Sequence, residues 1–180
     1  MVVVAPFSAV DPERRKPGEA ADVVKRRRLP LSEIAPEDEK LGQALAYWQS
    51  KRRNDLLPSR KDIDIIDLRP LIGFMHVVDV VDAAAGNFKF RLHGTRVRLG
   101  QSFAENSVEK YASKTMRDAT IEDYQSVCFT GVPCYQHIVA LIDFIQYSYS
   151  RLILPMATDG RTVDGLIICI NARKFSDYTI

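Results

Sequence analysis

Cysteine is scarce in this sequence. The 180 residues include three cysteines, Cys128, Cys134 and Cys169, and no two of them form a CxxC pair. An odd count without a signal peptide indicates free thiols in a reducing compartment. Cys128 and Cys134 flank the turn at residues 131–133, but no nearby group is placed to lower a thiol pKa. We therefore interpret them as buried, inert cysteines rather than a redox switch.

Long apolar runs are also missing. The longest strongly apolar segments, such as residues 165–170, have the length of a strand and fall well short of a membrane span. The opening Met-Val-Val-Val-Ala is too short for the apolar region of a signal peptide, and no basic residue precedes it. We therefore expect a cytoplasmic protein with no membrane span.

The familiar catalytic motifs are absent. The sequence has no Gly-x-Ser-x-Gly, no phosphate loop, no GxGxxG and no HExxH. Asp62, Asp64 and Asp67 are close together, but they stand among turn residues, where aspartate commonly closes turns. We therefore expect no catalysis, and a small-molecule enzyme is the third and most remote of the functions considered.

The chain has no large excess of charge of one sign. Its formal net charge is +2; residues 1–30 carry seven basic and four acidic side chains, and the rest of the chain is at −1. A nearly neutral domain lacks the basic surface of a nucleic-acid reader, so we expect no nucleic-acid partner. Prolines and clustered charges predict a disordered basic tail over 1–30, one domain over 31–172 and a short tail over 173–180.

An amphipathic helix is predicted over residues 36–53. Pro36 suits the first helical position, and the acids after it suit the positive end of the helix dipole. An apolar stripe follows at helical spacing: Leu41, Ala44, Leu45 and Trp48. The stripe can pack on the protein's own sheet or on a partner subunit. We predict a homodimer that uses Leu41, Leu45 and Trp48 at its interface.

The remaining elements are mostly strands. Residues 72–81 and 88–97 form a predicted hairpin around the loop at 82–87, and residues 107–129 form a predicted helix. Three more strands are predicted at 134–142, 147–157 and 162–171, with Asp159-Gly160 as the turn between the last two. This order predicts an α+β fold: a five-stranded antiparallel sheet with helices on one face and the leading amphipathic helix before it.

Several short motifs follow one another in a recognisable order. They are Tyr47-Trp48, Leu57-Pro-Ser-Arg60 with Asp62 and Asp64, Phe88 to Thr95, Tyr111, Pro133, Tyr149-Ser-Arg151, and Leu154-Pro155 before Asp159-Gly160. In this order and spacing the chain resembles the bacterial PAS-like family first catalogued as a domain of unknown function and common in alphaproteobacteria. The resemblance covers about residues 30 to 172.

The resemblance implies a sensory or dimerising role. PAS folds sense small molecules, cofactors or redox state, or act as dimerisation modules, and the fold alone does not choose among these roles. We expect a single-domain sensory or signalling module that acts through small-ligand binding, dimerisation or contacts with an unidentified partner protein. The alternative is a ligand-free scaffold that recruits a partner. Neither the residues nor the resemblance names a cofactor.

The stretch FKFRLHGTRV at residues 88–97 supplies most of the candidate site residues. Phe88, Phe90 and Leu92 alternate with Lys89, Arg91 and His93, which predicts a strand with one apolar and one cationic face. We expect Lys89 to lie nearest to solvent. The sequence does not assign the row of Lys89, Arg91 and His93 to one face of the sheet. A predicted ligand site takes these residues: Arg91, His93, Thr95, Tyr149 and Arg151. Alternatively, the two arginines pair with Asp79 or Asp143 and hold strands in register.

A histidine pair is the second candidate site. With the loop at 82–87, the predicted register places Val78 opposite Arg91 and His76 opposite His93. Opposed side chains at that spacing could share a metal ion, and His76 with His93 is our hypothesis for such a site. A partly buried structural pair is the alternative, because two ligands make an incomplete site.

Overall fold

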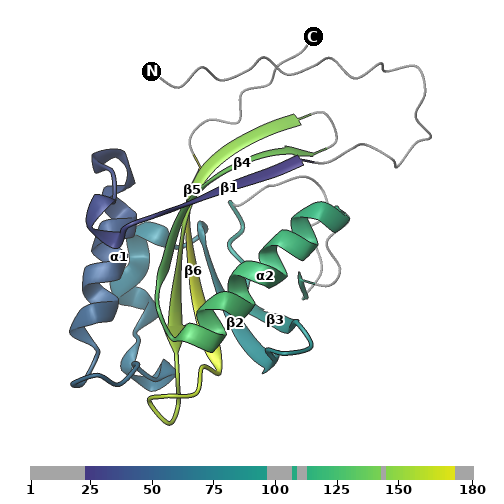
Figure 1. Cartoon of the computed structure of the whole chain (residues 1–180). Helices are drawn as coiled ribbons and strands as arrows, with labels where there is room; N and C mark the ends of the chain where they lie inside the picture. The colour runs from purple at the N-terminus through teal and green to yellow at the C-terminus, as the bar shows by residue number, and fades with distance from the viewer. Residues whose placement is uncertain (1–22, 97–106, 109–112, 143–144, 173–180) are drawn as a thin grey trace, which may run out of the picture.

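The computed structural model describes residues 23–96, 107–108, 113–142 and 145–172. Its centre is one antiparallel sheet with the strand order β1-β4-β5-β6-β2-β3 (Figure 1). The strands are β1 (Val23–Leu29), β2 (Met75–Asp82), β3 (Asn87–Leu92), β4 (Cys134–Ile142), β5 (Ile145–Met156) and β6 (Gly165–Ala172). The α+β class is confirmed, but the sheet has six strands where five were predicted.

The sixth strand comes from the segment predicted to be a disordered tail. Residues 23–29 form β1, which pairs with β4 from Val23 opposite Leu141 to Leu29 opposite Tyr135. The expectation of disorder is therefore wrong for this part of 1–30, and residues 1–22 lie outside the described part. A basic strand suits this position because charged side chains protect the edge of a sheet from further pairing.

Helices cover both faces of the sheet. Helix α2 (Lys114–Thr130) lies against one face, and helix α1 (Glu39–Ser50) lies against the other (Figure 1). Short 3-10 turns at Arg60–Asp62 and Ile65–Leu71 extend the α1 side. The leading helix therefore covers the sheet face that the α2 helix leaves open.

The apolar stripe of α1 packs inside its own protomer. Leu41, Leu45 and Trp48 are buried, and the Trp48 indole N–H donates to the Pro155 carbonyl at 2.8 Å. At the start of the helix, Asp38 accepts from the Tyr135 hydroxyl at 2.6 Å. The predicted dimer interface at Leu41, Leu45 and Trp48 is therefore wrong, because these side chains already fill the space between α1 and the sheet.

Helix and strand ends differ from the predicted ones by a few residues. The predicted helix at 107–129 begins at Lys114, because Ser113 rather than Ser107 supplies the cap: its side chain accepts from the Met116 N–H at 3.2 Å. Gly131, with a φ of 65°, ends the helix in the left-handed conformation. In the described part of the chain, no helix is long and apolar enough to cross a membrane.

Candidate functional site

The face of the sheet under α2 carries a group of charged and polar side chains, of which Asp123, Gln136 and Arg151 are buried. We call it the Asp123 cluster, and it consists of Arg26, Arg28, Asp123, Gln136 and Arg151. Three elements supply it besides α2: the edge strand β1, and the neighbouring strands β4 and β5. The arrangement follows from strand alternation, since Gln136 and Arg151 stand opposite each other in the β4–β5 pair and point to the same face.

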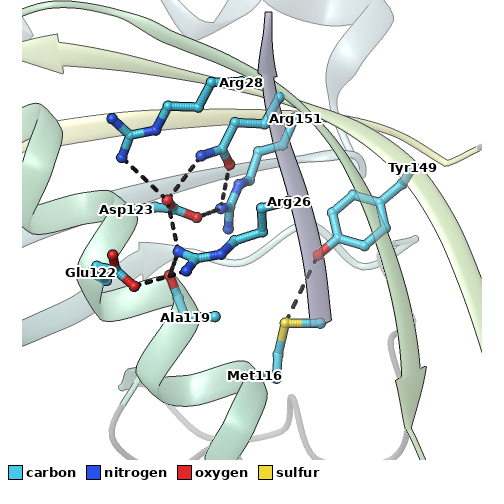
Figure 2. Close-up of polar contacts among 9 residues, drawn as sticks. Arg26, Arg28, Met116, Ala119, Glu122, Asp123, Tyr149 and Arg151 are labelled. Atoms are coloured by element: carbon cyan, nitrogen blue, oxygen red, sulfur yellow. Dashed lines mark hydrogen bonds and ion pairs between the residues drawn. The ribbon is translucent and has the colours of Figure 1, made fainter. Parts of the chain in front are cut away.

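The Asp123 carboxylate is the centre of this cluster (Figure 2). Arg151 donates to its Oδ2, and Gln136 donates to its Oδ1 at 2.8 Å. Arg26 from β1 reaches the same Oδ1 at 2.9 Å, and Arg28 lies 3.5 Å from it. Arg26 also donates to the Ala119 carbonyl at 2.8 Å. One carboxylate on α2 therefore holds side chains from β1, β4 and β5.

Burial makes this cluster electrostatically important. Asp123 is 1% exposed and Arg151 is 4% exposed, so both charges are out of water. Burial by itself would lower the pKa of Arg151, but the Asp123 carboxylate beside it raises that pKa, and the guanidinium stays charged. The Nε of Arg151 is buried and has no hydrogen-bond partner in the described part of the chain. A buried donor without an acceptor is a place where a ligand or water oxygen would gain a hydrogen bond.

Aromatic side chains fill the space beside the cluster. Tyr124 of α2 and Tyr149 of β5 are buried, and burial raises the pKa of both phenols. The Tyr149 hydroxyl lies 3.9 Å from the Met116 sulfur (Figure 2). Phe88 packs edge-on against the Tyr124 ring at 5.3 Å between centroids. Both phenols therefore remain neutral hydrogen-bonding groups at ordinary pH.

The histidine pair lies on the same face. The His76 and His93 rings are 4.4 Å apart between centroids, and Phe90 packs edge-on against both. His76 accepts the Gly94 N–H on its Nδ1 at 3.1 Å. Burial, together with the charges of His93 and Arg151, lowers the pKa of His76 to about 3, and burial also lowers the pKa of His93. Both rings are therefore neutral at pH 7.

The predicted hairpin register is right at the histidine end, where Val77 pairs with Leu92, and wrong in the middle of the hairpin. Val78 pairs with Phe90, not with Arg91, and Val80 rather than Val81 pairs with Phe88. Irregularities near each end of the hairpin cause the difference, and one residue of shift moves a side chain to the other face. The strict alternation of the 88–93 segment ends after Arg91. His93 consequently joins Phe90 on the α2 face, whereas Arg91 points to the α1 face.

The predicted ligand residues do not form one site. Arg151, Tyr149 and His93 lie on the α2 face, but Arg91 lies on the opposite face, where it pairs with Asp79 at 2.9 Å. Thr95 is exposed in the turn after β3. The alternative assignment holds for Arg91 with Asp79, while Arg151 takes Asp123 of α2 as its partner. A single site containing both arginines is therefore wrong, because the sheet separates them.

A metal site at the histidines stays a hypothesis. In the described residues, no group of three or more histidine, cysteine or acidic side chains could hold a metal ion together. The three cysteines are free, and burial raises the pKa of Cys128 and Cys169 to about 12 and raises that of Cys134. These thiols are protonated at neutral pH; Cys134 is buried as predicted, whereas Cys128 is half-buried.

Asp123 is the functional candidate that the sequence analysis missed. It stands between Thr120 and Tyr124 on the apolar stripe of α2, where a carboxylate is out of place without a buried partner. The period-two spacing of Arg26 and Arg28 is the matching signal in β1. The two signals lie almost a hundred residues apart, and only the β1–β4 pairing brings them together.

Comparison with known proteins agrees with this fold. A profile described as a PAS domain matches residues 37–167, nearly three quarters of the chain. No curated protein and no solved structure gives a significant match. The matched range includes both helices and every strand except most of β6 and the added β1. The bacterial branch suggested by the sequence stays a prediction, but the wider assignment is secure: the chain belongs to the PAS domain family.

Proposed function

We propose that this PAS domain is a sensory or signalling module that binds its input on the α2 face of the sheet. The observation that supports the proposal is the buried Arg151–Asp123 ion pair, which joins the sheet to α2 and continues through Arg26 to β1. PAS domains generally act as sensory or interaction modules rather than as catalysts. No catalytic step is part of the proposal.

The ion pair offers a physical route from input to output. A ligand oxygen that hydrogen-bonds to Arg151 competes with Asp123 for the same guanidinium. A buried carboxylate that loses part of its hydrogen bonding raises the free energy of the folded state. Weakening the contact between Asp123 and Arg151 therefore favours a rearrangement of the other contacts of Asp123. Arg26 is one of those contacts, so binding at Arg151 would change how firmly β1 is held. The strand β1 is the element through which a partner protein would sense the change.

The ligand expected here is small and bears an acceptor oxygen. Arg151, Tyr149 and His93 share the face, and each brings a different polar group: a guanidinium, a neutral phenol and a neutral imidazole. A carboxylate or carbonyl oxygen would suit the buried Nε of Arg151. Arg91 and Thr95 are not part of this site.

A ligand-free scaffold is the second candidate function. The large rings of Phe88, Tyr124 and Tyr149 are buried between α2 and the sheet. They fill space that a small ligand would otherwise occupy. A filled interior of this kind supports a module that works only through protein contacts. The two functions differ in whether a small molecule occupies the α2 face.

Native mass spectrometry with an absorption scan on gently purified protein separates the two functions. The sensory proposal expects an added mass or a visible band that Tyr149→Phe reduces, because this variant removes one hydroxyl without emptying the core. Tyr47→Phe, which removes a hydroxyl from α1 on the opposite face, is the matched control and should leave that mass unchanged. A clean unliganded mass, with no binding in a screen of metabolites and metals, would reject the sensor and favour the scaffold.

A homodimer stays a prediction for this chain, now without the α1 stripe as its interface. Light scattering after size exclusion measures the mass of the assembly directly. A mass of twice 20.4 kDa would support it, and a mass of 20.4 kDa over a wide concentration range would reject it.

A further inference from the structure

A cavity lies on the α1 face of the sheet, away from the Asp123 cluster. Its volume is about 190 Å³. Six apolar side chains and two arginines line it: Ile63, Ile65, Val77, Leu92, Met156, Ile167, Arg60 and Arg91. Val77 and Ile167 stand opposite each other in the β2–β6 pair and form part of the sheet wall. Ile63 follows the first 3-10 turn, and Ile65 begins the second. The lining of the cavity is therefore mostly apolar, and its two arginines are positively charged.

The two arginines give this cavity a net positive charge. Arg60 and Arg91 both pair with Asp79, with Arg91 at 2.9 Å, so a single carboxylate serves two guanidinium groups. One positive charge therefore remains in excess. Arg91 is largely exposed, whereas the Arg60 Nη1 is buried and lacks a hydrogen-bond partner in the described part of the chain. A buried guanidinium nitrogen needs an acceptor, and none of the apolar lining side chains offers one.

The backbone also makes room for this guanidinium. A Cβ on Gly165 of β6 would lie 3.2 Å from the Arg60 Nη2 and 3.1 Å from the Met156 methyl group. The absence of a side chain there lets Arg60 lie flat over the sheet between Met156 and Asp79, which pairs with Gly165. Arg60 is further held by its own turn, where Ser59 and Asp62 form a reciprocal cap. Its position is thus built by three elements.

We propose that this cavity binds a small carboxylate with a short apolar tail. The carboxylate would accept from Arg60 and Arg91, and the tail would lie against Val77, Met156 and Ile167. A volume of this size holds about six to eight non-hydrogen atoms, which corresponds to an acid of four to six carbons. The site is separate from the α2-face site and does not depend on the sensory proposal.

Titration of the full chain with sodium hexanoate, followed by methyl NMR, tests the proposal. We expect saturable binding with a Kd on the order of 1 mM or tighter, and shifts at Val77, Met156 and Ile167. Hexan-1-ol is the uncharged control and should bind at least about tenfold more weakly, because charged groups make the stronger hydrogen bonds. Equal binding of the alcohol, or no saturation with hexanoate, would overturn the proposal.

Two pairs of variants separate the charge from the cavity. Arg60→Met keeps an unbranched apolar stem but removes the guanidinium, and it should weaken hexanoate binding about tenfold or more, with a smaller loss for the exposed Arg91→Met. Leu92→Trp should block the cavity, while Val81→Trp, a similar exposed change on β2 outside the lining, should not. Hexanoate binding that Arg60→Met leaves unchanged would overturn the proposal. Shifts confined to methyl groups of the α2 face, such as that of Met116 beside Tyr149, would also overturn it, while supporting the α2-face site.

Discussion

At Asp123, one buried carboxylate meets the guanidinium groups of Arg26, Arg28 and Arg151, of which only that of Arg151 is itself buried. The Asp123→Asn substitution keeps the size of the side chain but removes the charge that balances the buried Arg151. Removing one partner of a buried ion pair typically costs about 3–5 kcal/mol, and we expect a loss of that size in the free energy of unfolding. Urea denaturation measures it.

The matched control for this substitution lies on the same helix. Asp118 is exposed and pairs with Lys114 one turn away, so Asp118→Asn makes the same chemical change in water. Exposed pairs contribute little, and the urea midpoint should stay within error. If Asp123→Asn were as harmless as Asp118→Asn, the cluster would not hold α2 to the sheet.

A loss of stability in mild acid is expected from the buried His76. Its folded pKa is about 3, below the unfolded value of 6.5, so between these values the unfolded chain binds a proton that the folded chain does not. Stability therefore falls as the pH drops below 6.5, and the contribution of His76 between pH 7 and pH 5 is about 2 kcal/mol. The half-buried His93, whose pKa is also lowered, acts in the same direction.

The His76→Phe variant isolates this effect. It should be less stable at pH 7, because the Gly94 N–H loses its acceptor, but its stability should fall less between pH 7 and pH 5. Urea titrations at several pH values provide the slopes. An unchanged slope would mean that His76 takes up its proton normally in the folded protein.

At the scale of the element, β1 depends on side chains as well as on its hydrogen bonds to β4. Arg26 links it to α2 through Ala119, Glu122 and Asp123 (Figure 2). In the Arg26→Met variant we expect amide hydrogen exchange in β1 to become about tenfold faster or more, because an edge strand with one neighbour opens easily.

Arg27 provides the control for that measurement. It is exposed on the same strand, so Arg27→Met changes the charge of β1 without removing the link to α2. Its amide exchange should match the wild type. Equal acceleration in both variants would assign the effect to the loss of surface charge instead of the Asp123 cluster.

Helix α1 is held by its buried stripe. Trp48→Ala would leave a large cavity and orphan the Pro155 carbonyl, with an expected cost of about 3–5 kcal/mol in the free energy of unfolding. The same variant should keep the assembly mass of the wild type wherever it is folded, because Trp48 faces its own sheet. A change in that mass on light scattering would contradict the burial of this stripe in the protomer.

At the scale of the whole molecule, the two helices share one sheet. Residues of β5 contact α1 on one face and α2 on the other, as with Pro155 to Trp48 and Arg151 to Asp123. Because neither face can open without exposing the sheet, we expect one cooperative unfolding transition. The fluorescence of Trp48 and the far-UV circular dichroism should then change at the same urea concentration. Separate midpoints would show that α1 opens alone.

Local patterns predicted most helices and strands, but not the faces on which the candidate residues lie. The apolar stripe of α1 and the runs of β5 and β6 are visible in the sequence because burial repeats with the period of the element. Arg91 and Arg151 were placed in one site because both are cations on strands. In the structure they lie on opposite faces of the sheet, because of the hairpin irregularities and because of the face to which Arg151 points from β5. A pattern within one segment does not show which of its faces lies beside a given face of a distant strand.

The sequence by itself determined the α+β class, the family, both helices and five of the six strands. Each of these depends on composition, spacing or motifs within short segments of the chain. The tertiary structure alone decided that residues 23–29 form the sixth strand, that Asp123 collects arginines from β1 and β5, and that Arg60 and Arg91 share Asp79 beside an apolar cavity. These features depend on pairs of residues far apart in the chain, and only the packing of the sheet brings such residues within reach of each other.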